Sequence, residues 1–293
     1  MLTEAQLEER KTGIGGSEVG AILGESRFAA PFDVWLSKVH GWRLEETDDM
    51  RRGSFLEDGI ARWYAQRYGH DLSRLSECKT LRHRLHPWAL CTSDRMVTAP
   101  AGRELLLSIK SPRRGGGEWG DAGTDQVPPE YLLQLQWEWA IHASHGMHLE
   151  ETMHLAALLD GDLEVFIIKA DVELQRWMLE AAGAWWERHV VQGVQPELDG
   201  SSQARAWLQR RFNANNAAFR EATPQEATRM LALELVERDV KQLEVEAETL
   251  RNELKLLMGE TTRITGPNGR IDWKSNVKQV RSFKPKWNKE QSP

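Results

Sequence analysis

Cysteine is scarce in this sequence, with only Cys78 and Cys91 among 293 residues. Two cysteines are too few for a disulfide framework, and neither belongs to the Cys-x-x-Cys or Cys/His pairs typical of zinc sites. We therefore interpret both as ordinary buried or half-buried thiols.

Long apolar runs are also missing from the sequence. No stretch approaches the ~20 residues that a membrane span needs, and residues 1–13 lack the apolar core and cleavage site of a secretory signal. The sequence thus predicts a cytoplasmic protein, in a bacterial or phage-infected cell, without a membrane partner.

The net charge of −6 argues against indiscriminate binding of polyanions, but the charge is unevenly distributed. Residues 261–293 contain eight Lys or Arg and only two acidic side chains, a net charge of +6. A globally acidic chain with a basic segment is compatible with DNA binding through local surfaces.

Hydrophobic periodicity and turn residues predict four regions: a main domain over 1–198, a connector over 199–223, a charged heptad helix over 224–259 and a basic β-hairpin tail over 260–293. The heptad seam is short for a free-standing coiled coil. The helix could pack on the main domain, on an antiparallel partner or on a second copy of the chain, and the sequence does not decide among these three. In the main domain we expect helices over 4–11, 31–40, 50–68, 129–143 and 171–192, a small antiparallel meander over 75–84, 89–98 and 104–111, and paired strands over 153–160 and 164–170.

The stretch 92–112 contains the residues best suited to chemistry. Asp94 lies at the end of one expected strand, and Ser108 and Lys110 alternate on the next, so their side chains share a face while Ile109 points into the core. A carboxylate and a lysine in this arrangement suit metal-assisted phosphodiester hydrolysis. Alone, the pair also fits an ordinary surface strand.

Five motifs in order give this chain a resemblance to a known family. They are Arg10-Lys-Thr-Gly-Ile-Gly-Gly-Ser17, Gly53-Ser-Phe-Leu-Glu57, Thr92-Ser-Asp94, Ile109-Lys-Ser-Pro112 and Tyr131-Leu-Leu-Gln134-Leu-Gln136. Together they resemble the lambda-exonuclease-like, YqaJ-type viral recombinases of the PD-(D/E)XK nuclease superfamily. The resemblance implies an α/β fold, a restriction-endonuclease-like core with a central mixed sheet flanked by helices, here followed by a C-terminal helical and β-hairpin extension.

The resemblance also implies roles for particular residues. Asp94, the backbone carbonyl of Ile109 and Glu57 would bind Mg²⁺, with Mn²⁺ as a substitute. Lys110 would be the catalytic lysine and Gln134 the active-site glutamine, while Arg10, Ser17 and Thr92 would hold the 5′ phosphate of a DNA end. Each has a plainer interpretation: Glu57 paired with Arg51 or Arg62, Gln134 and Gln136 as polar helix positions, Ser17 as a helix N-cap, and the tryptophans as core residues.

The implied function is a phage-type recombination exonuclease that degrades linear double-stranded DNA 5′ to 3′ and leaves a 3′ single strand for annealing. The implied partners are linear duplex ends, a single-strand annealing protein and further copies of the chain, for example in a toroidal trimer. Ser108 departs from the family, which has Glu or Asp there. The alternatives are therefore recruitment of another carboxylate, a substitution introduced to trap a DNA complex, or a catalytically impaired protein that binds DNA ends. Glu104 is ~13 Å away along the strand, too far to replace it. An endonuclease of the same fold is disfavoured by Arg10 and Ser17.

Overall fold

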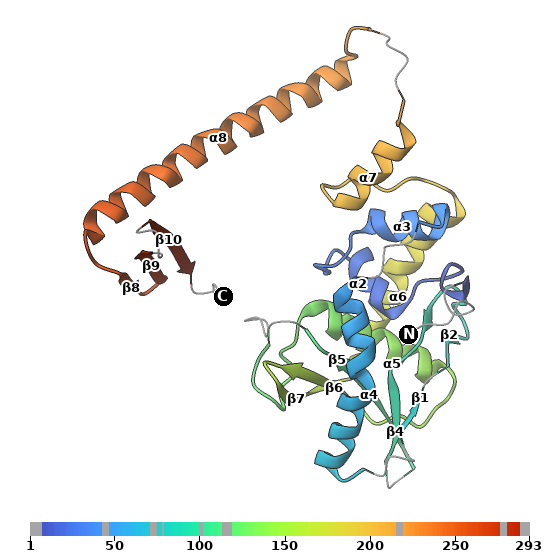
Figure 1. The fold of residues 1–293 in the computed structure, drawn as a ribbon. Helices are drawn as coiled ribbons and strands as arrows, with labels where there is room; N and C mark the ends of the chain where they lie inside the picture. Colours follow the sequence, from blue (N-terminus) through green and yellow to red (C-terminus); the bar gives the residue numbers. More distant parts are fainter. Residues whose placement is uncertain are drawn as a thin grey trace. The chain divides into compact units, whose positions relative to one another are not determined.

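The computed structural model describes residues 8–42, 47–70, 75–77, 79–99, 102–112, 119–214, 219–275 and 280–287. The chain divides into two compact units, Met1–Asn213 and Ala214–Pro293, which are considered separately (Figure 1). Residues 8–10 are helical, as expected for the first helix, while the start of that segment and Cys78 lie outside the described residues. Cys91 is a free, buried thiol.

A five-stranded mixed sheet forms the centre of the first unit, in the order β1-β4-β5-β6-β7. Strands β5 and β6 are parallel, and the other neighbours are antiparallel. The helix α5 connects the parallel pair, as a crossover of this kind requires. The expected α/β class with a central mixed sheet is therefore confirmed. The strands are β1 Leu75–Glu77, β4 Arg95–Thr98, β5 Glu104–Lys110, β6 Thr152–Leu159 and β7 Asp162–Lys169.

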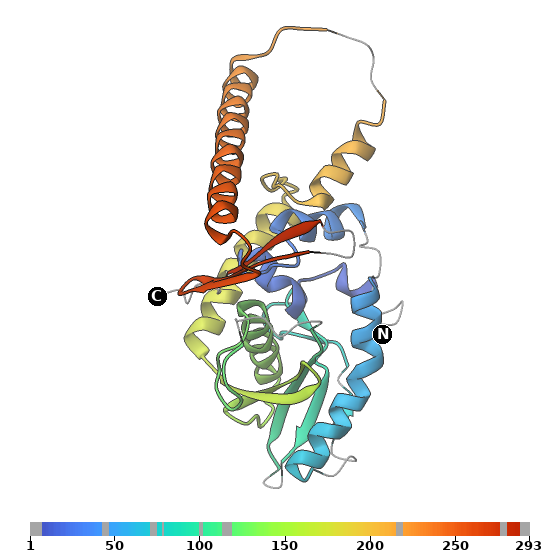
Figure 2. The same ribbon diagram turned by 60° about the vertical axis from the view of Figure 1, so that its left-hand side comes forward.

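Helices cover both faces of this sheet. Helix α4 (Asp48–Tyr68) packs Ile60 and Tyr64 on the face that contains Leu107 and Ile109. Helix α5 (Pro129–Ser144) packs on the opposite face, which contains Leu106, and Figure 2 shows the two helices separated by the sheet. Because side chains alternate along a strand, Ser108 and Lys110 point toward α5.

A helical layer completes the first unit. Trp35 of α3 and Trp207 of α7 pack together in one buried cluster. Because α7 lies within the connector expected over 199–223, that part of the connector belongs to the first unit. Trp137 is also buried, as expected of core tryptophans, whereas Trp63 and Trp177 are exposed. The elements are α2 Gly16–Ile22, α3 Pro31–His40, α6 Val172–Trp186 with its π-helical continuation η2 Glu187–Val191, and α7 Ser202–Arg211.

The expected antiparallel meander is confirmed, but its first two strands are interrupted. Each of its first two strands is divided: β2 (Leu81–Arg82) and β3 (Leu90–Cys91) form a separate two-stranded sheet, whereas β1 and β4 join the central sheet. The division after β3 falls at Thr92–Asp94, because the Asp94 carboxylate binds the backbone of β5 and interrupts the strand ladder. This interruption positions Asp94 for the site described below.

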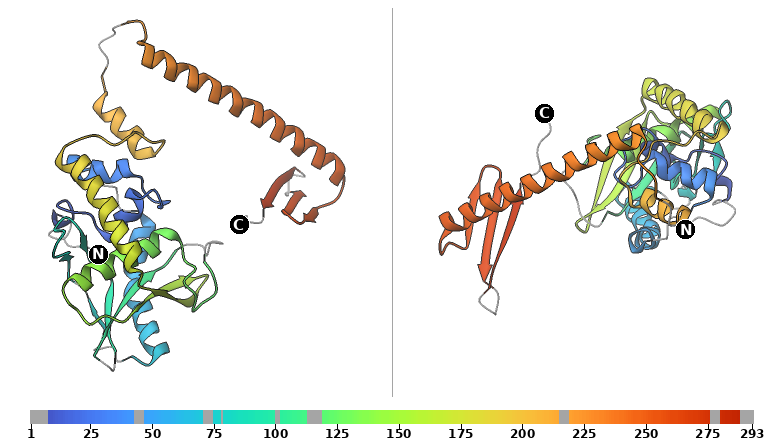
Figure 3. Two further views of the ribbon diagram at one scale, coloured as in Figure 1. Left: turned by 180° about the vertical axis from the view of Figure 1, so that it is seen from behind. Right: turned by 90° about the horizontal axis from the view of Figure 1, so that it is seen from above.

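The second unit contains one long helix and a small sheet, α8 (Pro224–Met258) and β8-β9-β10 (Figure 3). Thr223 and Glu226 form a capping box at the start of α8, and the heptad-seam residues Val236, Leu243 and Leu257 are exposed. The expected hairpin is present as β8 (Arg263–Gly266) and β9 (Gly269–Ser275), and a third strand, β10 (Arg281–Trp287), adds to it. Within the described residues, no helix is long and apolar enough to cross a membrane.

Candidate nuclease site

Asp94 lies immediately before the first residue of β4, beside the last residues of β5. Its Oδ2 accepts hydrogen bonds from the backbone N–H of Ile109 at 2.7 Å and from the Ser108 hydroxyl at 3.1 Å. The Lys110 Nζ lies 3.9 Å from the same oxygen. The structure therefore brings together four of the residues expected to form the site.

The backbone of Ile109 extends beyond the start of β4. The first residue of β4, Arg95, pairs with Leu107, so the N–H of Ile109 has the Asp94 carboxylate as its partner instead of a strand. The N–H and C=O of one strand residue point to the same side. The carbonyl of Ile109 therefore also faces this end of the sheet, on the side of Asp94.

Lys110 projects toward α5 and is largely shielded. Its side chain is 17% exposed, and its Nζ lies 5.3 Å from the centre of the Tyr131 ring, in a cation–π arrangement. Burial raises the pKa of the Tyr131 hydroxyl, and the neighbouring Lys110 charge opposes that rise. The ammonium group is thus held between a carboxylate and an aromatic face.

The helix α5 contributes Gln134 and an acidic residue that the sequence analysis missed, Glu138. The Gln134 Nε2 donates to the Glu138 Oε1 at 2.8 Å, and Glu138 is 2% exposed. Burial, and then the nearby charge of Asp94, raise the pKa of Glu138 to about 7, against hydrogen bonds and the Lys110 charge that lower it. A Glu between two Trp residues in the apolar part of α5 was the available signal for this residue.

Gln136, the second glutamine of the same motif, has a structural role. Its Nε2 donates to the carbonyl of Lys169 at 2.7 Å, and its Oε1 accepts from the backbone N–H of Asp171 at 3.0 Å. These bonds attach α5 to the segment between β7 and α6. The plainer interpretation therefore describes Gln136, while Gln134 lies beside Glu138.

Glu57 approaches Asp94 from the α4 side of the sheet and pairs with Arg95 instead of the expected Arg51 or Arg62. The Glu57 Oε1 accepts from Arg95 at 2.6 Å, and Arg95 also reaches Asp58. Burial and the Asp94 charge raise the pKa of Glu57, and the Arg95 charge opposes them. Arg95 is a second residue that the sequence analysis missed, because its partners come from a distant helix.

Arg10 and Ser17 are in direct contact. The Arg10 guanidinium donates to the Ser17 Oγ at 2.6 Å. The expectation that Ser17 is an N-cap is wrong, because α2 begins at Gly16 with Gly15 as its N-cap. The Glu18 carboxylate accepts from the Gly15 N–H at 2.7 Å. The hydroxyl of Ser17 is therefore not used for capping.

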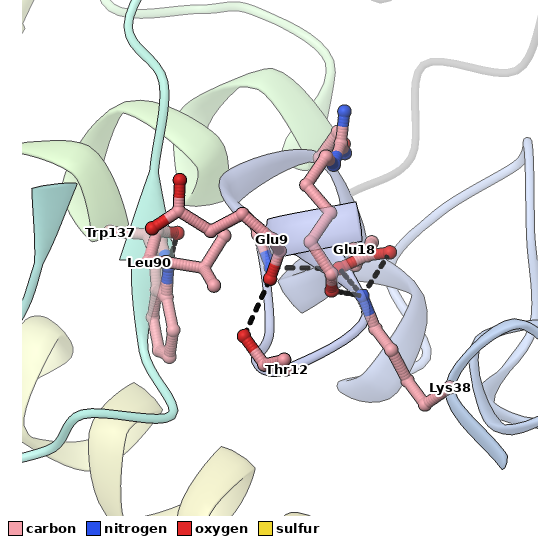
Figure 4. A network of polar contacts seen from close by, with 9 residues as sticks. Glu9, Thr12, Glu18, Lys38, Leu90 and Trp137 are labelled. Carbon is pink, nitrogen blue, oxygen red and sulfur yellow. Dashed lines mark hydrogen bonds and ion pairs between the residues drawn. The ribbon is translucent and has the colours of Figure 1, made fainter. Parts of the chain in front are cut away.

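A buried lysine supports this turn (Figure 4). The Lys38 Nζ lies 2.7 Å from Glu18 and 2.6 Å from the carbonyl of Arg10, and the Lys38 side chain is 1% exposed. Burial lowers the pKa of Lys38, while the charge of Glu18 raises it. Thr92, the third residue expected at the phosphate, hydrogen-bonds the Thr80 hydroxyl at 2.9 Å.

Gly16 joins the Arg10–Ser17 pair to the α5 residues. A Cβ added at Gly16 would lie 3.1 Å from the Glu138 Oε1 and 3.3 Å from the Gln134 Cγ. The turn before α2 also packs closely on the backbone of Trp88. Gly13 allows this contact, because a Cβ at Gly13 would lie 2.4 Å from the carbonyl oxygen of Trp88. The phosphate-binding candidates and the Asp94 cluster thus flank the same segment of α5.

Comparison with known proteins identifies a family that this chain resembles. Residues 6–147 match the family model of the YqaJ-like viral recombinase domain. This segment of the chain is therefore similar to a YqaJ-like viral recombinase domain. The chain is 29% identical over 261 residues to the uncharacterized protein YqaJ of Bacillus subtilis (strain 168), covering 87% of this chain and 78% of that protein. The family resemblance noted in the sequence is therefore confirmed.

Two solved structures share features of this chain at low identity. One is an alkaline exonuclease, LHK-Exo, from Laribacter hongkongensis, with 16% identity, a TM-score of 0.49, and coverage of 71% of this chain and 97% of that one. The other is a phage related exonuclease from Haemophilus somnus 129PT, with 13% identity, a TM-score of 0.46, and coverage of 62% and 96%.

The oxygen donors of the YqaJ-like domain suit a hard divalent cation. Asp94 offers a carboxylate and Ile109 a main-chain carbonyl, which are ligand types that Mg²⁺ prefers. Among the residues that the structure describes, no three His, Cys, Asp or Glu side chains are grouped to hold a metal ion together. The donor set therefore fits an ion held by the Asp94 carboxylate and the Ile109 carbonyl, with water in the remaining positions.

Proposed function

We propose that this chain is a magnesium-dependent exonuclease that degrades linear double-stranded DNA from 5′ to 3′ and leaves a 3′ single strand. The proposal is supported by the YqaJ-like domain and by one structural observation. The Asp94, Ser108, Ile109 and Lys110 cluster lies next to α5, and the Arg10–Ser17 pair adjoins the same stretch of α5 through Gly16. A site for a terminal phosphate beside a site for hydrolysis is the arrangement that an end-directed nuclease needs.

The chemistry of each residue suggests its role in hydrolysis. Asp94 and the Ile109 carbonyl would hold Mg²⁺, together with one glutamate from a flanking helix, Glu57 or Glu138. The bound ion would polarise the scissile phosphate and stabilise the charge that develops on it. Lys110, 3.9 Å from Asp94, would orient the attacking water and offset negative charge.

Arg10 and Ser17 would bind the 5′ phosphate. A guanidinium and a hydroxyl offer short, directional donors to phosphate oxygens, and these two already lie 2.6 Å apart. Lys38 and Glu18 fix the backbone of the turn from beneath. Following the family resemblance, we extend the proposal to a homo-oligomer, such as a toroidal trimer, and to cooperation with a single-strand annealing protein.

The test compares three substrates in Mg²⁺: a linear duplex with 5′ phosphates, the same duplex with 5′ hydroxyls, and a closed circle. We expect digestion of the linear substrates only, faster from phosphorylated ends, and none in EDTA. Lys110→Ala should lower the rate at least about 100-fold, the scale of losing one electrostatic contact to the transition state. Arg10→Ala should remove the preference for phosphorylated ends. Cutting of circles would instead indicate an endonuclease.

A second function, binding of DNA ends without cleavage, is favoured by Ser108. A serine hydroxyl is a neutral and weak ligand for Mg²⁺, and here it donates to Asp94. This alternative predicts that the chain binds 5′-phosphorylated ends in a fluorescence anisotropy assay, depends on Arg10 for that binding, and leaves every substrate intact in Mg²⁺ or Mn²⁺.

A further inference from the structure

Ser108 is a neutral residue at a position of the site where a carboxylate is expected. This residue is 1% exposed, and its hydroxyl is a hydrogen-bond donor to Asp94. It therefore adds no charge to the site, whereas Mg²⁺ is usually bound through one or two carboxylates. A second carboxylate on the same face of the sheet would strengthen the binding of a divalent ion.

Glu138 lies on that face. Ser108 and Lys110 point toward α5, and Glu138 is on α5, one turn after Gln134, which donates to it. Ser93, the residue before Asp94, lies close enough to the Glu138 carboxylate to lower its pKa. The carboxylate is thus near the loop that carries Asp94.

Glu138 forms no ion pair with a basic side chain in the described part of the chain. Its hydrogen-bond donor Gln134 is neutral, and the charge of Lys110 only partly opposes the rise in its pKa. A buried carboxylate beside a second carboxylate is costly in free energy, and the raised pKa of Glu138 reflects both effects. A divalent cation bound between the two groups would offset that cost.

Glu57 is placed less well for this role. It reaches Asp94 from α4, on the opposite face of the sheet from Ser108, and its Oε1 is bonded to Arg95 at 2.6 Å. A guanidinium at that distance already neutralises the carboxylate. Binding a cation there would require Glu57 to leave Arg95.

We propose that Glu138, rather than Glu57, provides the second carboxylate ligand of the ion held by Asp94, in place of the acid missing at position 108. The proposal rests on the proposed metal-dependent function. It makes Gln134 a positioning residue that orients the Glu138 carboxylate through the 2.8 Å hydrogen bond.

The test is a calorimetric titration of the full chain with Mn²⁺ in the absence of DNA. We expect Glu138→Gln to weaken Mn²⁺ binding at least about tenfold, and Glu57→Gln to weaken it less than about threefold, because removing a first-sphere carboxylate costs more than changing a distant charge. Glu130→Gln is the matched control: this glutamate is also buried on α5 but pairs with Arg27, and its replacement should leave the Mn²⁺ affinity unchanged.

A double variant tests the exchange of positions directly. Ser108→Glu combined with Glu138→Gln moves the carboxylate back to the strand, and should recover most of the Mn²⁺ affinity lost in Glu138→Gln. Should Glu138→Gln fail to fold, Glu138→Asp, which shortens the side chain by one methylene, provides the same comparison.

The outcomes separate the two proposals. Wild-type binding of Mn²⁺ by a Glu138→Gln chain, or a larger loss in Glu57→Gln, would overturn the role of Glu138 while leaving the nuclease function standing. A wild-type chain that neither binds Mn²⁺ nor cuts DNA would overturn both.

Discussion

Two kinds of buried charge occur in the first unit, and they contrast in sign. Lys38 with Glu18, and Arg95 with Glu57, are pairs of opposite charge at 2.7 and 2.6 Å. Asp94 and Glu138 are like charges near each other: Glu138 accepts a hydrogen bond from the neutral Gln134, and one cation, Lys110, lies 3.9 Å from Asp94. Opposite pairs stabilise local geometry, whereas a buried pair of like charge is unfavourable until a cation binds. We infer that the pairs of opposite charge stabilise the fold, whereas Asp94 and Glu138 are placed to bind a cation.

The largest effect should follow from breaking the more deeply buried opposite pair. Lys38→Met leaves Glu18 without its counter-charge and frees the Arg10 carbonyl, so the free energy of unfolding should fall by about 3 kcal/mol. Urea denaturation measures this change. Lys11→Met, at a half-exposed lysine that pairs with Glu8, should change stability by less than about 0.5 kcal/mol. Equal losses in the free energy of unfolding for both variants would contradict the stabilising role assigned to the buried Lys38–Glu18 pair.

Arg95→Leu should destabilise the fold by a smaller amount, about 2 kcal/mol. Arg95 is buried, but its partners Glu57 and Asp58 are 32% and 69% exposed at the side chain, so water compensates part of the lost interaction. Thermal unfolding of Arg95→Leu beside Arg51→Leu, whose Asp48 contact is exposed, measures the difference. A loss no greater than that of Arg51→Leu would contradict the assigned role of Arg95.

His142 should make the stability of the fold sensitive to acid. It is 2% exposed, and burial lowers its pKa from 6.5 to about 4. Above pH 6.5 the imidazole is neutral in both states. As the pH falls below 6.5 the unfolded chain takes up a proton that the folded chain excludes, so the free energy of unfolding should fall, by up to about 2 kcal/mol near pH 5. His142→Gln should remove this component from a series of urea titrations at pH 7.5 to 5; an unchanged slope would contradict it.

The smallest effect concerns the contact between the two halves of the site. Gly16→Ala places a Cβ 3.1 Å from the Glu138 Oε1, so we expect a loss of about 1 kcal/mol in stability together with weaker Mn²⁺ binding. Gly20→Ala is the control on the same helix, because its added Cβ would be 3.4 Å from its nearest neighbour. Equal Mn²⁺ affinity in both variants would show that Gly16 does not position Glu138.

The strand alternation around Asp94 could be predicted from sequence, because Ser108 and Lys110 are two residues apart and share a face by local geometry. The hairpin of β8 and β9 followed from its Gly-Pro-Asn-Gly turn in the same way. The pairing of Arg95 with Glu57 could not be predicted, since it joins residues 38 apart across the packing of α4 on the sheet.

Glu138 illustrates the limit most clearly. One acidic residue in the apolar pattern of α5 indicates a buried or special position, but its neighbours Gly16 and Ser93 come from distant segments. The N-cap of α2 was predicted wrongly for a different reason. Gly15 takes the N-cap position with help from Glu18, which a pattern of preferred capping residues does not reveal.

The most direct measurement is X-ray diffraction from crystals of this chain containing Mn²⁺, recorded at a wavelength where manganese scatters anomalously. The account predicts an anomalous peak at coordination distance, roughly 2 Å, from carboxylate oxygens of both Asp94 and Glu138 and near the Ile109 carbonyl. A peak shared by Asp94 and Glu57, with Glu138 still bonded to Gln134, would contradict it.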